Sequence, residues 1–222
     1  MDRKIVVSVL ALTLIALALA ISLPGGRKVD DEPRLPWLVS VNADGYSSVF
    51  GLTLGASRLA DARAVFEEQG VSNLFLSADD ELSVETYFQS LYLSGIRADM
   101  VLTLELERPT LQRYFDRGAR ISKLESGAKK VNLAGEDEAA LADARIGHIT
   151  YIPGTDLSEE LILSRFGEPA RRLAESSGIV HWLYPDIGLD IAVNPDGKEV
   201  LQYVQPGRFG ELLKPLQSGT GE

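Results

Sequence analysis

Residues 151–205 read YIPGTDLSEELILSRFGEPARRLAESSGIVHWLYPDIGLDIAVNPDGKEVLQYVQ, and this part of the 222-residue chain decides the expected fold. Apolar residues recur at helical spacing from Leu157 to Phe166, and Gly167 and Pro169 prevent the helix from continuing. Turns rich in Pro and Gly then separate three strand-like runs, at 179–184, 189–193 and 199–205. The stretch therefore predicts a short helix packed on an antiparallel meander.

The start of this helix also has a local signal. Asp156 is followed three residues later by Glu159, which is the spacing of a reciprocal N-terminal cap. We therefore expect the helix to begin at Asp156.

An earlier part of the chain has a similar order of predicted elements. Apolar residues have helical spacing from Leu59 to Phe66, with Ser57 as the expected N-cap and Gly70 as the stop. Strand-like segments follow at 71–76, 84–96 and 102–106. The sequence therefore predicts an α+β fold with antiparallel sheets packed by helices on one face. It also predicts a tandem helix-plus-meander repeat.

The N-terminus carries a separate signal. The segment from Ile5 to Leu23 is a run of 19 uncharged residues. As a helix it would span about 28 Å, close to the hydrocarbon thickness of a bilayer. The alternative is a cleaved signal peptide, with Ala18-Leu19-Ala20 as the small-residue site. Both interpretations export the remainder, and we favour a single-pass inner-membrane anchor with the C-terminal domain in the periplasm. The alternative is a periplasmic or secreted protein.

These signals divide the chain into six parts. The divisions are a transmembrane anchor or signal peptide (1–23), a linker rich in Pro, Gly and charged residues (24–36), a first α+β repeat (37–110), a connecting hairpin and helix (111–145), a second α+β repeat (146–213) and a tail (214–222).

The composition excludes several classes of function. Formal net charge is −10, and because residues 1–23 contribute +1, the rest of the chain carries −11. An acidic exported part disfavours binding to nucleic acid and docking on anionic lipid head groups. The chain has no cysteine and only two histidines, so the sequence predicts no metal site and no cofactor.

Short motifs in the second unit resemble those of a known family. They are Arg165-Phe166-Gly167-x-Pro169, Trp182-x-Tyr184, Gly188-Leu189 and Gly197-Lys198-Glu199-Val200. The unit resembles the SmpA/OmlA family of small outer-membrane lipoproteins, which assist β-barrel assembly, and their helix-plus-meander unit occurs in duplicate in the β-lactamase inhibitor proteins. The resemblance implies this fold and a tendency to bind proteins. The family's lipidated Cys is absent here, so its outer-membrane location and its role in barrel assembly do not transfer.

Three aromatic residues are the candidate protein-binding residues. Trp182 and Tyr184 share one sheet face because strand side chains alternate, and Tyr203 is expected to join them from the last strand. If helices cover that face, the three residues belong to the core. If the face is open, they form an aromatic platform of the kind that anchors protein interfaces.

No reactive constellation can be recognised in the sequence. His181 and Asp190 lie in adjacent predicted strands, and a pair of this kind can perform acid–base chemistry. No nucleophile or third group accompanies them, so we favour a structural or exposed histidine.

Three functional hypotheses remain open, and the simplest is a structural spacer with no ligand of its own. The other two involve binding or catalysis. The first is a membrane-anchored envelope protein-binding or assembly module without catalytic activity, whose partner is another envelope protein. The second is an exported small-ligand-binding protein or carboxylate-dependent hydrolase, with a site between the two repeats and Asp186 or Asp190 as the reacting group.

Overall fold

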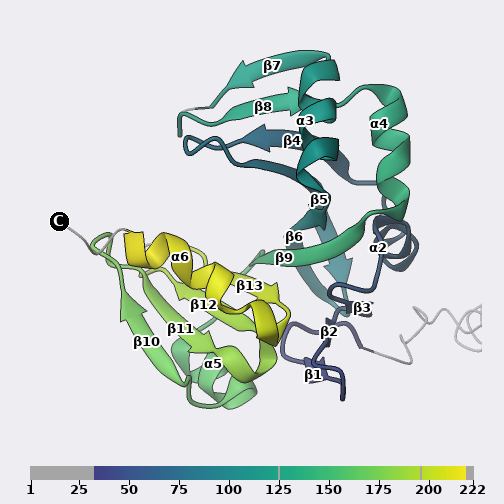
Figure 1. The fold of residues 1–222 in the computed structure, drawn as a ribbon. Helices are drawn as coiled ribbons and strands as arrows, with labels where there is room; N and C mark the ends of the chain where they lie inside the picture. Colours follow the sequence, from purple (N-terminus) through teal and green to yellow (C-terminus); the bar gives the residue numbers. More distant parts are fainter. Residues whose placement is uncertain (1–32, 125, 196, 219–222) are drawn as a thin grey trace, which may run out of the picture. The chain divides into compact units, whose positions relative to one another are not determined.

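A ten-stranded antiparallel sheet dominates the computed structural model, which describes residues 33–124, 126–195 and 197–218 (Figure 1). The strands run in the order β10-β11-β12-β13-β9-β6-β5-β4-β8-β7, so β6 and β9 join two groups of strands. Their bounds are β4 (Val71–Leu76), β5 (Leu82–Leu93), β6 (Ile96–Glu105), β7 (Arg120–Lys123), β8 (Lys129–Asn132), β9 (Arg145–Pro153), β10 (Arg171–Ala174), β11 (Val180–Tyr184), β12 (Leu189–Val193) and β13 (Val200–Val204). The predicted α+β class with antiparallel strands is confirmed.

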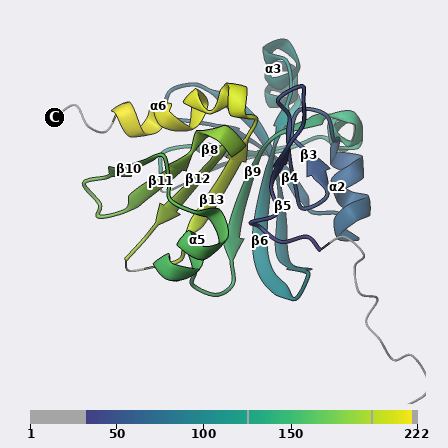
Figure 2. The same ribbon diagram turned by 90° about the horizontal axis from the view of Figure 1, so that it is seen from below.

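Helices lie on both faces of this sheet rather than on one face as predicted, and they cover the two faces unequally. The main core contains buried side chains of α2 (Leu59–Phe66), α3 (Arg108–Arg117), η1 (Leu141–Asp143) and α5 (Glu159–Phe166). The C-terminal helix α6 (Gly210–Ser218) packs through Leu212 in a second, smaller cluster with Leu183 and Val204. Figure 2 shows strands β10–β13 between α5 and α6. The remaining short helices are α4 (Gly135–Ala140), η2 (Pro185–Ile187) and η3 (Pro206–Arg208).

Burial alternates along the central strands, which separates two faces of the sheet. On β6 and β9, residues such as Leu102 and Ile149 are buried, whereas Thr103 and Thr150 next to them are half-buried. Because strand side chains point alternately to opposite sides, the half-buried residues share one face. We call this the open face, and over β4, β5, β6 and β9 it consists of Val71, Asn73, Phe75, Ser83, Glu85, Tyr87, Asp99, Val101, Thr103, Glu105, His148, Thr150 and Ile152.

The first strands form a small separate sheet that closes the core. They are β1 (Ser40–Val41), β2 (Ser47–Val49) and β3 (Leu52–Thr53). Phe50 and Gly51 form the two-residue turn between β2 and β3, and both have positive φ, as this type of tight turn requires. The Phe50 ring stacks on Tyr151 with 4.9 Å between ring centroids. A non-glycine residue in this conformation is strained, and buried aromatic packing holds it there.

Most of the predicted elements are present, with several corrections. Helix α5 is capped by the Ser158 side chain, which accepts from Leu161 N, so the predicted cap at Asp156 is wrong. The meander after α5 has four strands, because β10 precedes the three predicted runs. Helix α2 has Arg58 at its N-cap rather than the expected Ser57, and it ends at Glu67, which adopts the left-handed conformation, before Gly70. The helix expected in the connecting segment (111–145) is divided into the short helices α4 and η1.

The predicted membrane anchor or signal peptide (1–23) and most of the linker lie outside the described residues. Within the part of the chain that the structure describes, none of the helices has the length and apolar character needed to cross a bilayer.

Candidate functional site

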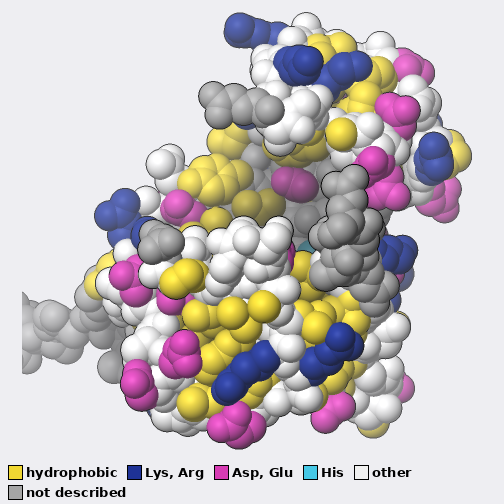
Figure 3. Space-filling model, turned by 90° about the vertical axis from the view of Figure 1, so that its left-hand side faces the viewer, with side chains coloured by type: hydrophobic (Ala, Val, Ile, Leu, Met, Phe, Trp, Pro, Cys, Tyr) yellow, Lys and Arg dark blue, Asp and Glu magenta, His cyan; other side chains and the backbone are white. Residues whose placement is uncertain are grey.

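An open cleft of about 890 Å³ lies where β6 and β9 meet, and it extends from α6 and η3 to the start of α3. Figure 3 shows the molecule hollowed between its two lobes, with hydrophobic and acidic side chains visible in the hollow. Thr103 and His148 contribute to its floor, and both belong to the open face. The cleft therefore lies over the open face of β5, β6 and β9, with η3 and α6 forming one of its walls.

A bulge shapes the floor of the cleft. Thr103 pairs with His148 and Leu104 pairs with Ile146, so Gly147 is the extra residue on β9. A Cβ atom at Gly147 would lie 2.7 Å from Glu105 Cγ, which is closer than real contacts allow. Glycine at this position therefore lets the Glu105 side chain lie against β9.

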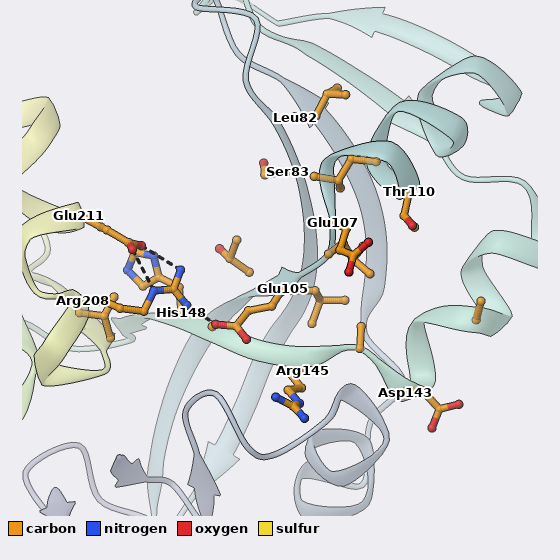
Figure 4. Close-up of a pocket in the computed structure, with 18 residues that line it drawn as sticks. Leu82, Ser83, Glu105, Glu107, Thr110, Asp143, Arg145, His148, Arg208 and Glu211 are labelled. Carbon is orange, nitrogen blue, oxygen red and sulfur yellow. Dashed lines mark hydrogen bonds and ion pairs between the residues drawn. The ribbon is translucent and has the colours of Figure 1, made fainter. Parts of the chain in front are cut away.

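One wall is an ion-pair network (Figure 4). Arg208 lies between Glu105 and Glu211, donating from its Nε to Glu211 Oε1 at 2.9 Å and pairing through Nη1 with Glu105. The hydrogen bond from Arg208 lowers the pKa of Glu211, and the same hydrogen bond raises the pKa of Arg208. Arg208 and Glu211 are therefore both charged, and the network of the three side chains connects η3 and α6 to β6.

His148 lies beside this network and, unlike Arg208 and Glu211, carries no charge at neutral pH. Its Nε2 is buried and has no hydrogen-bond partner among the described residues. Burial lowers its pKa to about 4, while Glu211 opposes that shift and Arg208 adds to it. The imidazole is therefore neutral at neutral pH.

The opposite wall is mixed in character. Glu107 and Thr110 line it at the start of α3, Leu111 adds an apolar surface, and Asp143 and Arg145 lie at its lower end (Figure 4). Asp143 pairs with Arg58 at 2.8 Å. Among the described lining residues, none of the hydroxyl groups is hydrogen-bonded to His148. The arrangement is suited to holding a polar and apolar surface by complementary contacts rather than to activating a nucleophile.

The three predicted binding residues lie elsewhere. Trp182, Tyr184 and Tyr203 are only 2%, 6% and 1% exposed, and all three belong to the main core. The Tyr184 hydroxyl donates to Gly167 O at 3.0 Å, and the Tyr203 hydroxyl donates to Pro36 O at 2.9 Å. Of the two alternatives weighed for these residues, the core is the one that their burial matches.

His181 and Asp190 do meet, and Glu175 joins them. His181 Nδ1 lies 2.7 Å from Asp190 Oδ2, and His181 Nε2 lies 3.0 Å from Glu175 Oε1. A general base needs one ring nitrogen free to face a substrate, and here both nitrogens are engaged. The cluster is therefore structural in its chemistry. Neither Asp190 nor Asp186, which is exposed on η2, lines the cleft.

Sequence reasoning did not find the residues that line the cleft. Glu105 and Arg208 are 103 positions apart, and the pairing of β9 with both β6 and β13 brings their elements together. The available signal was local, since Glu105 and His148 occupy polar positions in alternating strands. That pattern identifies a solvent-facing surface, but it does not predict which elements lie opposite each other across the cleft.

Comparison with known proteins gives no relative. No family model, curated protein or solved structure matches this chain.

Proposed function

We propose that this chain is a membrane-anchored envelope protein whose exported α+β domain binds another protein through the open face and its cleft, without catalysing a reaction. Residues 5–23 would provide the anchor, with the domain on the periplasmic side of the inner membrane. Cleavage after a signal peptide would instead release the same domain into the periplasm.

The alternation of burial along β5, β6 and β9 is the observation that carries this proposal. Val84, Leu102 and Ile149 are completely buried in the main core, whereas the open-face residues beside them stay half-buried or exposed. Tyr87 and Val71 face each other across β5 and β4, and they are 36% and 60% exposed. A concave sheet surface with exposed aromatic and aliphatic groups and fixed charges at its rim suits a protein partner.

The resemblance to the SmpA/OmlA and β-lactamase inhibitor proteins belongs to the same proposal. The order of elements supports a duplicated helix-plus-meander unit, because α2 precedes β4–β6 and α5 precedes β10–β13. The role proposed for the domain is therefore binding, which is what that resemblance implies.

Site-specific photo-crosslinking in cells tests this proposal. A photoreactive phenylalanine analogue at Tyr87, on the open face, should capture one discrete partner in the envelope fraction. The matched control is Tyr46, which is also 36% exposed but lies outside the ten-stranded sheet. Capture at both positions alike, or at neither, would contradict binding through the open face.

A small-ligand-binding protein or hydrolase remains the second candidate, because the cleft volume falls in the range that small molecules occupy. The carboxylates that could act there are Glu105, Glu107, Asp143 and Glu211, since Asp186 and Asp190 lie elsewhere. Metabolite-mixture screening by ligand-observed NMR separates the two candidates. A compound that binds wild type and is lost in Thr103→Trp, which would fill the cleft, favours this second function.

A further inference from the structure

Glu85 is a half-buried carboxylate near the centre of the open face. On β5 it lies between Asn73 of β4 and Thr103 of β6, directly across the two ladders. Asn73 is 7% exposed, so this row of the sheet is more enclosed than the row of Val71 and Tyr87 beside it. Glu85 therefore lies at the bottom of the concave surface rather than at its rim.

No cationic side chain of the described residues pairs with Glu85. Its only hydrogen bond comes from the Ser83 hydroxyl at 3.5 Å, the outer limit of such a contact. Burial raises the pKa of Glu85, and the Ser83 hydrogen bond offsets part of that shift. A carboxylate withdrawn from water without a counter-charge is unfavourable, so a cation arriving at this position gains more than it would at an exposed carboxylate.

Other acidic residues of the open face already have partners. Glu105 pairs with Arg208. Asp99 accepts a hydrogen bond from Ser90 N at 2.7 Å and also interacts with the Tyr87 hydroxyl. Of the three carboxylates, Glu85 is therefore the one without a close ion-pair or hydrogen-bond partner in the described part of the chain, and it lies between Tyr87 and the cleft.

We propose that Glu85 binds the guanidinium or ammonium group of an Arg or Lys side chain on a basic protein segment that occupies the open face. Carboxylates accept such groups through short, charge-assisted hydrogen bonds. Tyr87 and Val71 lie in the adjacent row, where they can pack along the aliphatic stem of the incoming side chain. The net charge of −11 on residues 24–222 also attracts a basic partner. This inference rests on the proposed protein-binding function and names the chemistry of the partner.

Two small probes that differ in charge test the inference. The full chain is kept in detergent micelles with isotope-labelled Val and Thr methyl groups, and Nα-acetylarginine amide or its neutral isostere Nα-acetylcitrulline amide is added at low ionic strength. The arginine probe should shift the methyl signals of Val71, Val101 and Thr103, and the citrulline probe should not. Equal shifts with the two probes, or no shift with arginine at millimolar concentration, would overturn the inference.

Matched variants place the effect at one residue. Glu85→Gln should weaken binding of the arginine probe on the order of tenfold, because a charge-assisted hydrogen bond is replaced by a neutral one. Glu81→Gln, in the exposed turn before β5, should leave the affinity unchanged. Unchanged binding in Glu85→Gln would contradict the assignment. If Tyr87 crosslinking nevertheless captures a partner, the inference fails while the proposed function stands.

Discussion

At the residue scale, the pKa values of the two histidines are shifted in opposite directions because their surroundings differ. His181 has a carboxylate at each ring nitrogen, and the Asp190 hydrogen bond raises its pKa, while burial opposes the shift. His148 has no partner at Nε2, and burial lowers its pKa to about 4. One histidine is therefore stabilised as a cation and the other as a neutral ring.

Substitution of His181 tests whether its ring is stabilised as a cation. The charged ring stabilises the fold below its unfolded pKa near 6.5, and that contribution is lost as the pH rises through the higher folded pKa. His181→Gln should lower the free energy of unfolding by about 2–4 kcal/mol at pH 5.5, because Asp190 loses a buried partner. The difference from wild type should be smaller at pH 8.5. Urea titrations at both pH values measure it, and a difference that grows with pH would contradict the ion pair.

Substitution of His148 should give the opposite trend. Since its folded pKa is about 4 and its unfolded pKa is near 6.5, wild type loses stability as the pH falls between these values. The loss is at most about 1.4 kcal/mol per pH unit. His148→Gln removes the titrating group, so its free energy of unfolding should fall less steeply over this window. Parallel pH profiles for variant and wild type would show that His148 is not held neutral by burial.

At the element scale, the β2–β3 turn closes the core between the two groups of strands. Phe50 stacks on Tyr151 of β9 and meets the Tyr203 ring of β13 edge-on at 5.7 Å between centroids. Ser47 Oγ donates to Val204 O at 3.0 Å, which also ties β2 to β13. The β2–β3 hairpin thus covers the core side of β9 and β13.

Removal of the Phe50 ring tests this role. Phe50→Ala should lower the free energy of unfolding by about 3–5 kcal/mol, because the ring is almost fully buried and its loss leaves a cavity. Tyr92→Ala is the control, since Tyr92 is 56% exposed and should change stability little. Thermal and urea denaturation monitor both. A loss below about 1 kcal/mol in Phe50→Ala would mean that the turn does not support the core.

The strands that sequence reasoning found and missed differ in a physical way. Strands β5 and β6 were visible because one face is buried, which imposes alternation. Their bounds were only partly right, since the segment predicted at 84–96 runs through the turn between them and the next was predicted to begin at 102. Strand β10 was missed because it is an edge strand, and three of its four residues are exposed. An exposed edge carries no hydrophobic period, and charged residues such as Arg171 are favoured there. The helix cap was misplaced because Asp156 and Ser158 both suit a cap, and only the backbone path decides between them.

At the scale of the whole molecule, the candidate site could not be predicted because it depends on strand order. The pairing of β6 with β9 joins residues 96–105 to residues 145–153, and α6 then approaches from the C-terminus. The local sequence around Glu105, His148 and Arg208 does not predict that these residues lie close together. The aromatic residues that sequence reasoning selected were conspicuous because they are large, and large aromatic side chains most often fill a core.

If the domain binds as proposed, another protein of the envelope covers the open face of the sheet. The chain has no cysteine, so Val71→Cys on the open face and Ala64→Cys on the exposed side of α2 each introduce a single thiol. The decisive measurement is the rate at which a membrane-impermeant maleimide labels each thiol, in spheroplasts and in the purified full chain. We predict that labelling of Val71→Cys is at least about tenfold slower in spheroplasts, while Ala64→Cys reacts equally fast in both. Equal rates at Val71→Cys in the two preparations would contradict the account.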